Sequence, residues 1–287
     1  MPNTIKPNYI GRFAPSPSGP LHLGSLSCAL ASYLDAKANN GEWLLRIEDI
    51  DPPREVIGSS DSIIACLLAH HLAWDGEILY QSTRSQAYRQ ALDKLRDLGL
   101  SYFCQCTRQT LSATGSIYSG HCRTLGHTHG AVRLDLSKIS RTECHFNDLI
   151  KGAQQQQFSH HGDCVIHRKD GLFAYQLAVV VDDIAQGITH VIRGDDLLET
   201  TGHQQLLFQL LGAAAPRYGH IAVLLDEQGR KLSKQNGAPA LNNQQPLNNL
   251  TKALIALQLT PPARITQIDT LLQWAIAQWA IKYSDPQ

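Results

Sequence analysis

The sequence lacks several features that mark specialised protein classes. Its 25 basic residues only balance its 25 acidic ones, so net charge gives no support for non-specific polyanion binding. No apolar run approaches the roughly 20 residues of a membrane span, and the N-terminal residues have no signal-peptide stretch. The seven cysteines are odd in number and unevenly spaced, which fits reduced thiols better than a disulfide framework. These absences predict a cytoplasmic protein with no membrane partner.

The pattern along the chain predicts an α/β domain with an insertion. Strand-like and helix-like segments alternate through the first hundred residues, which favours βαβ units and a parallel sheet. The alternation stops at a polar, cysteine-containing stretch and then resumes. We therefore divide the chain into a first half of the sheet domain, an insertion, a second half and a short helical C-terminal region, at 1–100, 101–163, 164–240 and 241–287.

Local patterns predict individual elements. Short apolar runs that end in turn residues predict strands at 9–13, 43–47, 190–192 and 221–225. Apolar residues at helical spacing predict helices around 26–34, 63–68, 88–98 and 204–211, and a turn signal predicts a hairpin at 165–173. Three cysteines in apolar contexts are expected to be buried thiols: Cys28, Cys66 and Cys164.

A first candidate phosphate-binding segment is His22-Leu23-Gly24-Ser25, which follows a Pro- and Gly-containing loop and opens a predicted helix. A helix N-terminus offers unpaired N–H groups and a partial positive charge. Gly24 lets a planar ring or a phosphate approach the backbone, and His22 can donate to a phosphate oxygen. A capped surface helix with a chance histidine would look the same in sequence.

The second candidate segment is Lys231-Leu232-Ser233-Lys234-Gln235, after a predicted strand and a polar turn. Its two ammonium groups lie on a loop that can close over a triphosphate. Such a segment alone is usually a solvated basic turn. The two segments in this order, each after a predicted strand, indicate ATP-dependent activation.

These segments resemble the HIGH and KMSKS signatures of class I aminoacyl-tRNA synthetases. The run 12–19, followed by 21–24, is similar to glutamyl-tRNA synthetases in particular, and segments at 46–49, 175–178 and 190–198 agree in the same order. The resemblance covers roughly 9–240. It implies a Rossmann-like parallel sheet with helices on both faces, an inserted zinc-containing subdomain and a short helical C-terminal region.

The sequence departs from the family pattern at three positions. Leu232 and Gln235 replace Met and Ser in the second signature, and neither change removes a group assigned to the chemistry. His203 stands where many relatives have Arg, which puts its contact with ATP or RNA in doubt.

A glutamate pocket needs cationic groups, best supplied by the planar guanidinium of Arg, for two carboxylates, and one anionic group for the ammonium. Arg12, Glu48 and Arg193 are expected at the carboxyl edge of the sheet, and Tyr175 can close the pocket. Each residue alone could belong to an ordinary ion pair or a capped strand end; the four together, on successive strand ends, favour a pocket. The resemblance implies glutamate contacts at these four and along the run Arg12, Phe13, Ala14, Pro15 and Ser16.

The family resemblance also implies the reaction. The α-carboxylate of L-glutamate would attack the α-phosphorus of ATP and release pyrophosphate, a step that needs no general base. His22, Lys231 and Lys234 would be the catalytic groups. His22, Gly24 and Lys234 would bind ATP, which Mg²⁺ accompanies.

Three cysteines in the predicted insertion form a candidate metal site. Cys104, Cys106 and Cys122 lie within about 20 residues, which is a fair signal for structural zinc, although scattered core cysteines are the alternative. Chemistry alone leaves the fourth ligand open between His121 and Tyr118. The subgroup that the chain most resembles has C-x-C…Y-x₃-C, which implies Cys104, Cys106, Tyr118 and Cys122.

The acceptor of the activated glutamate is the last expectation. The sequence ends at Gln287, soon after the second segment, and so resembles the shortened paralogues that transfer glutamate to queuosine in the anticodon loop of tRNA(Asp). Two alternatives remain: a short glutamyl-tRNA synthetase that charges a tRNA 3′ end, and a non-catalytic paralogue that binds glutamate or RNA. We expect a monomer.

Overall fold

A parallel sheet forms the centre of the computed structural model, which describes residues 9–113, 117–226, 228–232 and 237–283. Its strands pair in two parallel groups: β1 (Ile10–Phe13), β2 (Glu42–Ile47) and β3 (Leu79–Tyr80), and then β9 (His190–Gly194) with β10 (Arg217–Ile221). The N–H of Thr189 donates to the carbonyl of Ile10 at 2.9 Å, which brings β9 beside β1. The predicted parallel sheet is confirmed.

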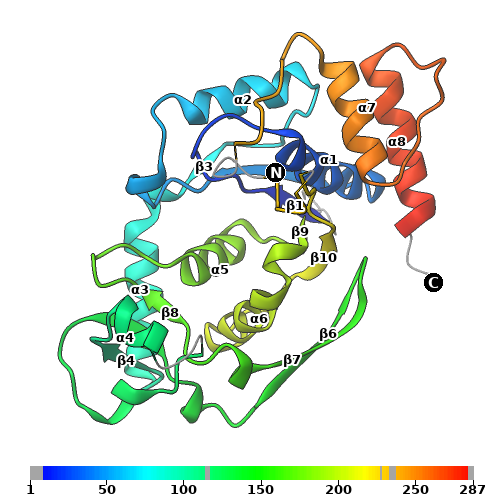
Figure 1. Ribbon diagram of the computed structural model, residues 1–287. Coiled ribbons are helices and arrows are strands. Elements are labelled where there is room, and N and C mark those ends of the chain that lie inside the picture. The colour runs from blue at the N-terminus through cyan, green and yellow to red at the C-terminus, as the bar shows by residue number, and fades with distance from the viewer. Residues whose placement is uncertain (1–8, 114–116, 227, 233–236, 284–287) are drawn as a thin grey trace, which may run out of the picture.

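Helices cover both faces of this sheet (Figure 1). One face carries α1 (Leu23–Ala38), α2 (Ser59–Ala69), α7 (Pro246–Ala256) and α8 (Ile268–Tyr283). The other carries α3 (Ser85–Asp97), α5 (Tyr175–Gln186) and α6 (Thr201–Leu210). Each set encloses its own apolar core, one around Leu30 and Trp43 and one around Leu177 and Phe208. The helices predicted around 26–34, 63–68, 88–98 and 204–211 are present as α1, α2, α3 and α6.

The stretch between α3 and α5 contains short antiparallel strands. They are β4 (Ser101–Cys104), β5 (Ala131–Leu134), β6 (Glu143–Asp148), β7 (Gly152–Gln157) and β8 (Val165–His167), with the short α4 (Arg108–Ala113) after β4. β5 pairs with β4 and β8, and β6 pairs with β7 as a hairpin. Since β8 begins after 163, this small sheet crosses the boundary drawn there, and the three boundaries between the segments stay predictions.

Two expectations about local structure differ from the fold. The strand predicted at 221–225 is wrong, because β10 ends at Ile221 and the chain then leaves the sheet. Beyond it, the N–H of Val223 donates to the Asp195 carboxylate at 3.0 Å, and Leu225 bridges only Lys231. The apolar run that begins at Tyr175 is the helix α5, so Tyr175 lies at a helix start and not at a strand end.

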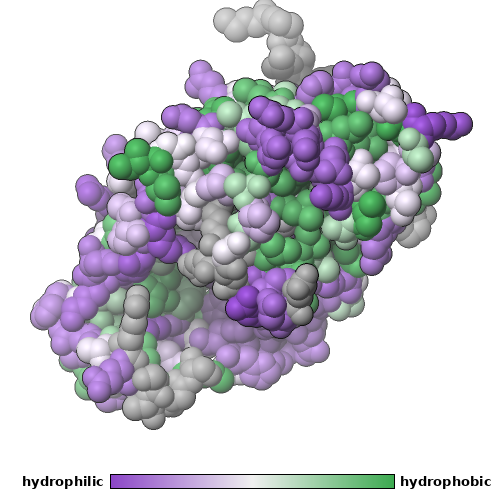
Figure 2. Space-filling model, turned by 45° about the horizontal axis from the view of Figure 1, so that its top comes forward, coloured by the Kyte–Doolittle hydropathy of each residue, from purple (hydrophilic) through white to green (hydrophobic). Residues whose placement is uncertain are grey.

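The surface of the molecule is mixed. Figure 2 shows one face that is hollowed near its centre, with hydrophilic residues dominating around the hollow. Among the helices that the structure describes, none is both long and apolar enough to cross a membrane.

Candidate active site

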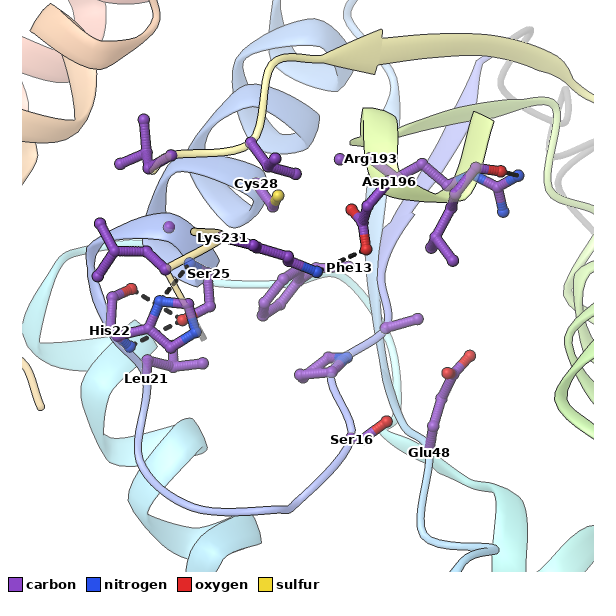
Figure 3. Close-up of a pocket in the computed structure, with 18 of the residues that line it drawn as sticks. Phe13, Ser16, Leu21, His22, Ser25, Cys28, Glu48, Arg193, Asp196 and Lys231 are labelled. Atoms are coloured by element: carbon purple, nitrogen blue, oxygen red, sulfur yellow. Dashed lines mark hydrogen bonds and ion pairs between the residues drawn. The ribbon is translucent and has the colours of Figure 1, made fainter. Parts of the chain in front are cut away.

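A cavity of ≈ 390 Å³ opens at the carboxyl ends of the parallel strands. Phe13 ends β1, Glu48 follows β2, Gly194 ends β9 and Ala222 follows β10, and all four line the cavity. Ligands of open α/β sheets bind at this edge, because the loops and helix N-termini that follow the strands meet there. The N-terminus of α1 forms the opposite side, with His22, Gly24 and Ser25 in the wall (Figure 3).

The cavity brings together most of the residues predicted as a site. Its lining includes all the predicted glutamate contacts: Arg12, Phe13, Ala14, Pro15, Ser16, Glu48, Tyr175 and Arg193. It also includes His22, Gly24 and Lys231 from the two candidate phosphate-binding segments. Ser233, Lys234 and Gln235 lie outside the described residues.

His22 is the N-cap of α1, and its ring orientation follows from that role. The N–H of Ser25 donates to Nδ1 of His22 at 3.3 Å, while the N–H of His22 donates to the Ser25 hydroxyl at 2.8 Å. This reciprocal pair is a capping box, which satisfies two donors at the helix start. Since Nδ1 accepts, the proton of the neutral ring is on Nε2. His22 therefore offers an N–H donor in addition to capping the helix.

Gly24 lies where the two sequence segments meet. A Cβ at this position would lie 3.2 Å from the His22 ring and 3.5 Å from the carbonyl oxygen of Leu232. The 231–232 segment is held there by the N–H of Leu232, which donates to the carbonyl of Leu224 at 2.7 Å. Lys231 extends across the cavity, where its Nζ meets Asp196 at 2.5 Å (Figure 3).

Asp183 of α5 forms a buried ionic network with two strands. Nε and Nη2 of Arg12 in β1 donate to its two oxygens at 3.2 Å each, and Nη1 of Arg46 in β2 donates at 2.7 Å. All three side chains are at most 5% exposed. Burial alone would raise the pKa of Asp183, but the charges of Arg12 and Arg46 outweigh it and hold the pKa below its usual range. Asp183 is therefore ionised and fixes both guanidinium groups.

Glu48 is the less satisfied acid of this network. It is buried at the cavity wall, and Nη2 of Arg46 is 3.5 Å from its Oε1. Burial raises its pKa, although the charges of Arg46 and Arg12 act in the opposite direction. A cation that bound beside Glu48 would favour its ionised form. Glu48 is thus suited to receive an ammonium group.

Arg193 lies on the far side of the cavity from His22 (Figure 3). Its Nε donates to His220, and its two terminal nitrogens donate to the side chains of Gln204 and Thr201 and to the carbonyl of Leu197. The remaining N–H faces the hydroxyl of Tyr175 at 3.5 Å, which is the longest of these contacts. All five N–H groups of the guanidinium have a partner, and the weakest partner lines the cavity.

Sequence reasoning missed several residues that build this site. Arg46 and Asp196 lay inside the quoted segments at 46–49 and 190–198, but neither was singled out. Asp183 and its neighbour Asp182 follow the apolar run 177–181 in α5, and buried carboxylates after such a run signal buried partners. Cys66 is buried as predicted, whereas Cys28 and Cys164 are only partly buried, and Cys28 lines the cavity. Cys28 lies in α1 between the cavity and the apolar core, against which it also packs.

His203 has a structural position. It is 3% exposed, its Nε2 is 3.2 Å from the carbonyl oxygen of Gly162, and its ring packs edge-on against Phe158 and His161. Burial lowers its pKa, which favours the neutral ring. His203 is not among the described residues that line the cavity.

The three cysteines of the candidate metal site come together. The sulfur atoms of Cys104, Cys106 and Cys122 lie within 4.8 Å of one another. The hydroxyl of Tyr118 is 3.6 Å from the Cys104 sulfur and accepts the N–H of Cys122 at 2.9 Å. Although burial opposes ionisation of Cys104, hydrogen bonds from Tyr118 and Arg133 lower its pKa to about 7. His121 is exposed and is not part of the described cluster. The donor set fits a divalent metal ion.

Comparisons with known proteins agree with this geometry. Residues 10–257 match the family described as tRNA synthetases class I (E and Q), catalytic domain. The chain is 51% identical to the Glutamyl-Q tRNA(Asp) synthetase of Colwellia psychrerythraea, over 94% of this chain and 90% of that protein. It is 45% identical to the protein of the same name from Vibrio vulnificus, over 96% of this chain and 90% of that one.

Solved structures show the same fold. A glutamate tRNA ligase from Elizabethkingia meningosepticum, in complex with its amino acid, is 30% identical with a TM-score of 0.70 and matches 80% of this chain. The chain spans 52% of the length of that ligase. Methionyl-tRNA synthetase from Mycobacterium tuberculosis, in complex with methionyl-adenylate, is 12% identical with a TM-score of 0.55, over 87% of this chain and 63% of that one. The class I synthetase fold predicted from the sequence is confirmed.

Replacement of Asp183 by Asn tests the buried network. The change leaves Arg12 and Arg46 without their shared carboxylate, so we expect the free energy of unfolding at pH 7 to fall by about 3–5 kcal/mol in urea denaturation. The exposed Asp97, changed to Asn, is the control and should alter it by less than about 1 kcal/mol.

The stability contributed by Asp183 should also depend on pH in a defined direction. The pKa of Asp183 is lower in the folded protein than the value of about 3.9 in an unfolded chain. Its stabilisation is therefore complete above that value and is lost as pH falls through the folded pKa. The difference between wild type and the Asp183→Asn variant should shrink below about pH 4. A difference that did not change with pH would contradict the network.

Proposed function

We propose, since the chain belongs to the class I tRNA synthetase (E and Q) catalytic-domain family, that it activates L-glutamate with ATP and transfers it to queuosine in the anticodon loop of tRNA(Asp). The observation that carries the proposal is one cavity whose lining includes Arg12, Arg193, the buried Glu48 and the N-terminus of α1. Such a cavity offers cationic groups for carboxylates, an anion for an ammonium group, and helix N–H groups for phosphate.

Glutamate binding is supported by donors that remain available at the cavity wall. Arg12 gives Nε and Nη2 to Asp183, and its Nη1 makes no hydrogen bond within the described residues. Arg193 directs one N–H toward the Tyr175 hydroxyl at 3.5 Å, a contact long enough to be exchanged for a carboxylate. We assign the two carboxylates of glutamate to these arginines, with Tyr175 as a further donor, and the ammonium to Glu48. The run from Phe13 to Ser16 forms the adjacent wall.

Activation requires the glutamate α-carboxylate to lie beside the α-phosphorus of ATP. A carboxylate oxygen forms the new P–O bond, and the bond to the pyrophosphate oxygen breaks. The carboxylate is already a nucleophile, so orientation and charge stabilisation supply the acceleration. Nε2–H of His22 and the α1 N-terminus would donate to phosphate oxygens, and Gly24 would allow their close approach. Lys231, Lys234 and the Mg²⁺ that accompanies ATP would balance the negative charge.

Transfer completes the proposed reaction. A hydroxyl of the cyclopentene-diol of queuosine attacks the carbonyl carbon of the adenylate, an ester forms, and AMP leaves. The relatives named Glutamyl-Q tRNA(Asp) synthetase support this acceptor, since they match over nearly their whole length. The glutamate ligase from Elizabethkingia meningosepticum, whose name gives the amino acid, supports the first step.

The acceptor is tested with labelled glutamate, ATP and tRNA(Asp) with or without queuosine. We expect pyrophosphate exchange without any tRNA, and label only on tRNA that contains queuosine. A queuosine-containing tRNA without its 3′-terminal adenosine is the matched control and should still be labelled. Label that needs the terminal adenosine would support 3′-end charging instead. No glutamate-dependent exchange would support a non-catalytic paralogue.

Two substitutions of His22 separate its capping from its catalytic role. Asn keeps an acceptor for the Ser25 N–H but has no group at the Nε2 position, while Gln has an amide near Nε2 and caps poorly. We expect His22→Asn to lower kcat of pyrophosphate exchange about 10²–10³-fold and His22→Gln to lower it less. In thermal unfolding, the Gln variant should be the less stable by about 1 kcal/mol. An Asn variant with wild-type kcat would reduce His22 to a helix cap.

We further propose that Cys104, Cys106, Cys122 and Tyr118 hold one structural zinc ion. This ion would hold together a part of the chain whose apolar cluster is small. Elemental analysis should find one zinc per chain in wild type and none in Cys122→Ser. Tyr118→Phe should weaken zinc affinity at least about tenfold, whereas His121→Ala should leave it unchanged. The reverse order would make His121 the fourth ligand.

A further inference from the structure

Behind Arg193 lies a buried pair that the proposed chemistry does not use. Nε of Arg193 donates to Nε2 of His220 at 3.0 Å, and Nδ1 of His220 meets Oδ2 of Asp148 at 2.5 Å. His220 is in β10 and is fully buried, and Asp148 ends β6 and is 1% exposed. The three side chains form one row from the cavity wall into the protein.

The row fixes the protonation of the imidazole. A guanidinium N–H can only donate, so Nε2 of His220 must accept and carries no proton. The proton of the neutral ring is therefore on Nδ1, and it is donated to Asp148. The other oxygen of Asp148 accepts the N–H groups of Ile150, Lys151 and His220 at 2.8–3.1 Å. Burial alone would raise the pKa of Asp148, but the hydrogen bond from the His220 ring and these backbone hydrogen bonds hold it below its usual range. Asp148 is thus an ionised acceptor in a fixed position.

We propose that Asp148 and His220 are positioning residues that orient the Arg193 guanidinium toward the carboxylate of the substrate. The inference rests on the proposed function in taking glutamate as that substrate. A guanidinium held at Nε cannot rotate about its long axis, so the N–H that faces Tyr175 stays directed to the cavity. The hairpin of β6 and β7 thereby supports the site, although none of its described residues lines the cavity.

A simple packing role would not need this row. Burial of a carboxylate and an imidazole removes two polar groups from water, and apolar side chains of similar volume fill such a space at less cost. Apolar groups cannot supply a hydrogen-bond acceptor for Arg193, whereas an imidazole whose proton is fixed on Nδ1 can. Thr201, whose hydroxyl is 3.2 Å from Nε2, shares that acceptor and also receives Nη2 of Arg193. The acceptor therefore organises two contacts of the same guanidinium.

The isosteric change Asp148→Asn tests the inference. The Asn oxygen still accepts the three backbone N–H groups, but its NH₂ replaces the oxygen that received the His220 proton. Nδ1 must then accept, the proton moves to Nε2, and an N–H faces the N–H of Arg193. We expect the glutamate KM in pyrophosphate exchange to rise roughly tenfold or more, with the ATP KM unchanged. Nitrogen NMR of labelled histidine should show the proton on Nδ1 in wild type and on Nε2 in the variant.

A rescue and a control make the test specific. His220→Gln in the Asp148→Asn background returns an acceptor to Arg193 and should recover part of the lost affinity for glutamate. Asp35→Asn is the matched control, because Asp35 is also a buried carboxylate with side-chain donors, Tyr9 and Trp279, away from this cavity. Its glutamate KM should equal that of wild type.

The outcomes distinguish this inference from the proposed function. An unchanged tautomer in Asp148→Asn, or a changed tautomer with wild-type glutamate KM, would overturn the positioning role. A wild type with no glutamate-dependent exchange would overturn the proposed function and, with it, the glutamate part of this inference. The NMR result would still decide whether Asp148 sets the tautomer of His220.

Discussion

The carboxylate of Asp183 is the interaction on which the floor of the cavity depends. It joins β1, β2 and α5, because Arg12 and Arg46 reach it from the two strands while the helix carries it. Without that charge, two buried guanidinium groups would face each other across a low-dielectric space, at a cost of several kcal/mol. With it, Nε and Nη2 of Arg12 are bound to Asp183 and Nη1 stays available to the cavity, while Arg46 lies beside Glu48. In the proposed function, Arg12 and Glu48 contact the amino acid. Both are therefore positioned by an ionic network whose central carboxylate, Asp183, is not assigned to the substrate.

The two sequence segments that indicated a nucleotide site meet at the opposite wall. The carbonyl of Leu232 lies near Gly24 at the start of α1. Lys231, one residue earlier, is held by Asp196 at the end of β9. An incoming triphosphate would thus exchange one anionic partner of Lys231 for another, so the charge of the lysine is compensated both before and after ATP binds.

Local rules predicted the parts of this site that local sequence determines. Short apolar runs placed β1 and β2, helical spacing placed α1, and the Pro- and Gly-containing loop before His22 marked where α1 begins. The partners of the arginines were not predicted, because Arg12 and Asp183 are 171 residues apart in the sequence and Asp148 and His220 are 72 residues apart. No short motif connects such pairs. The strand expected at 221–225 failed for a related reason: those residues have strand-like side chains, but Asp195 draws their backbone out of the sheet.

Within the described residues, each charged group assigned to a substrate already has a protein partner. Arg12 is paired with Asp183, Lys231 with Asp196 and Glu48 with Arg46. Arg193 reaches a carboxylate only through the imidazole of His220. A buried charge without a partner would cost several kcal/mol, more than a marginally stable fold can easily carry. In the proposed function, glutamate would therefore be selected through contacts that are long enough to be exchanged, rather than through an excess of charge. The 3.5 Å contacts of Arg193 with Tyr175 and of Glu48 with Arg46 are the two that a substrate can replace with shorter ones.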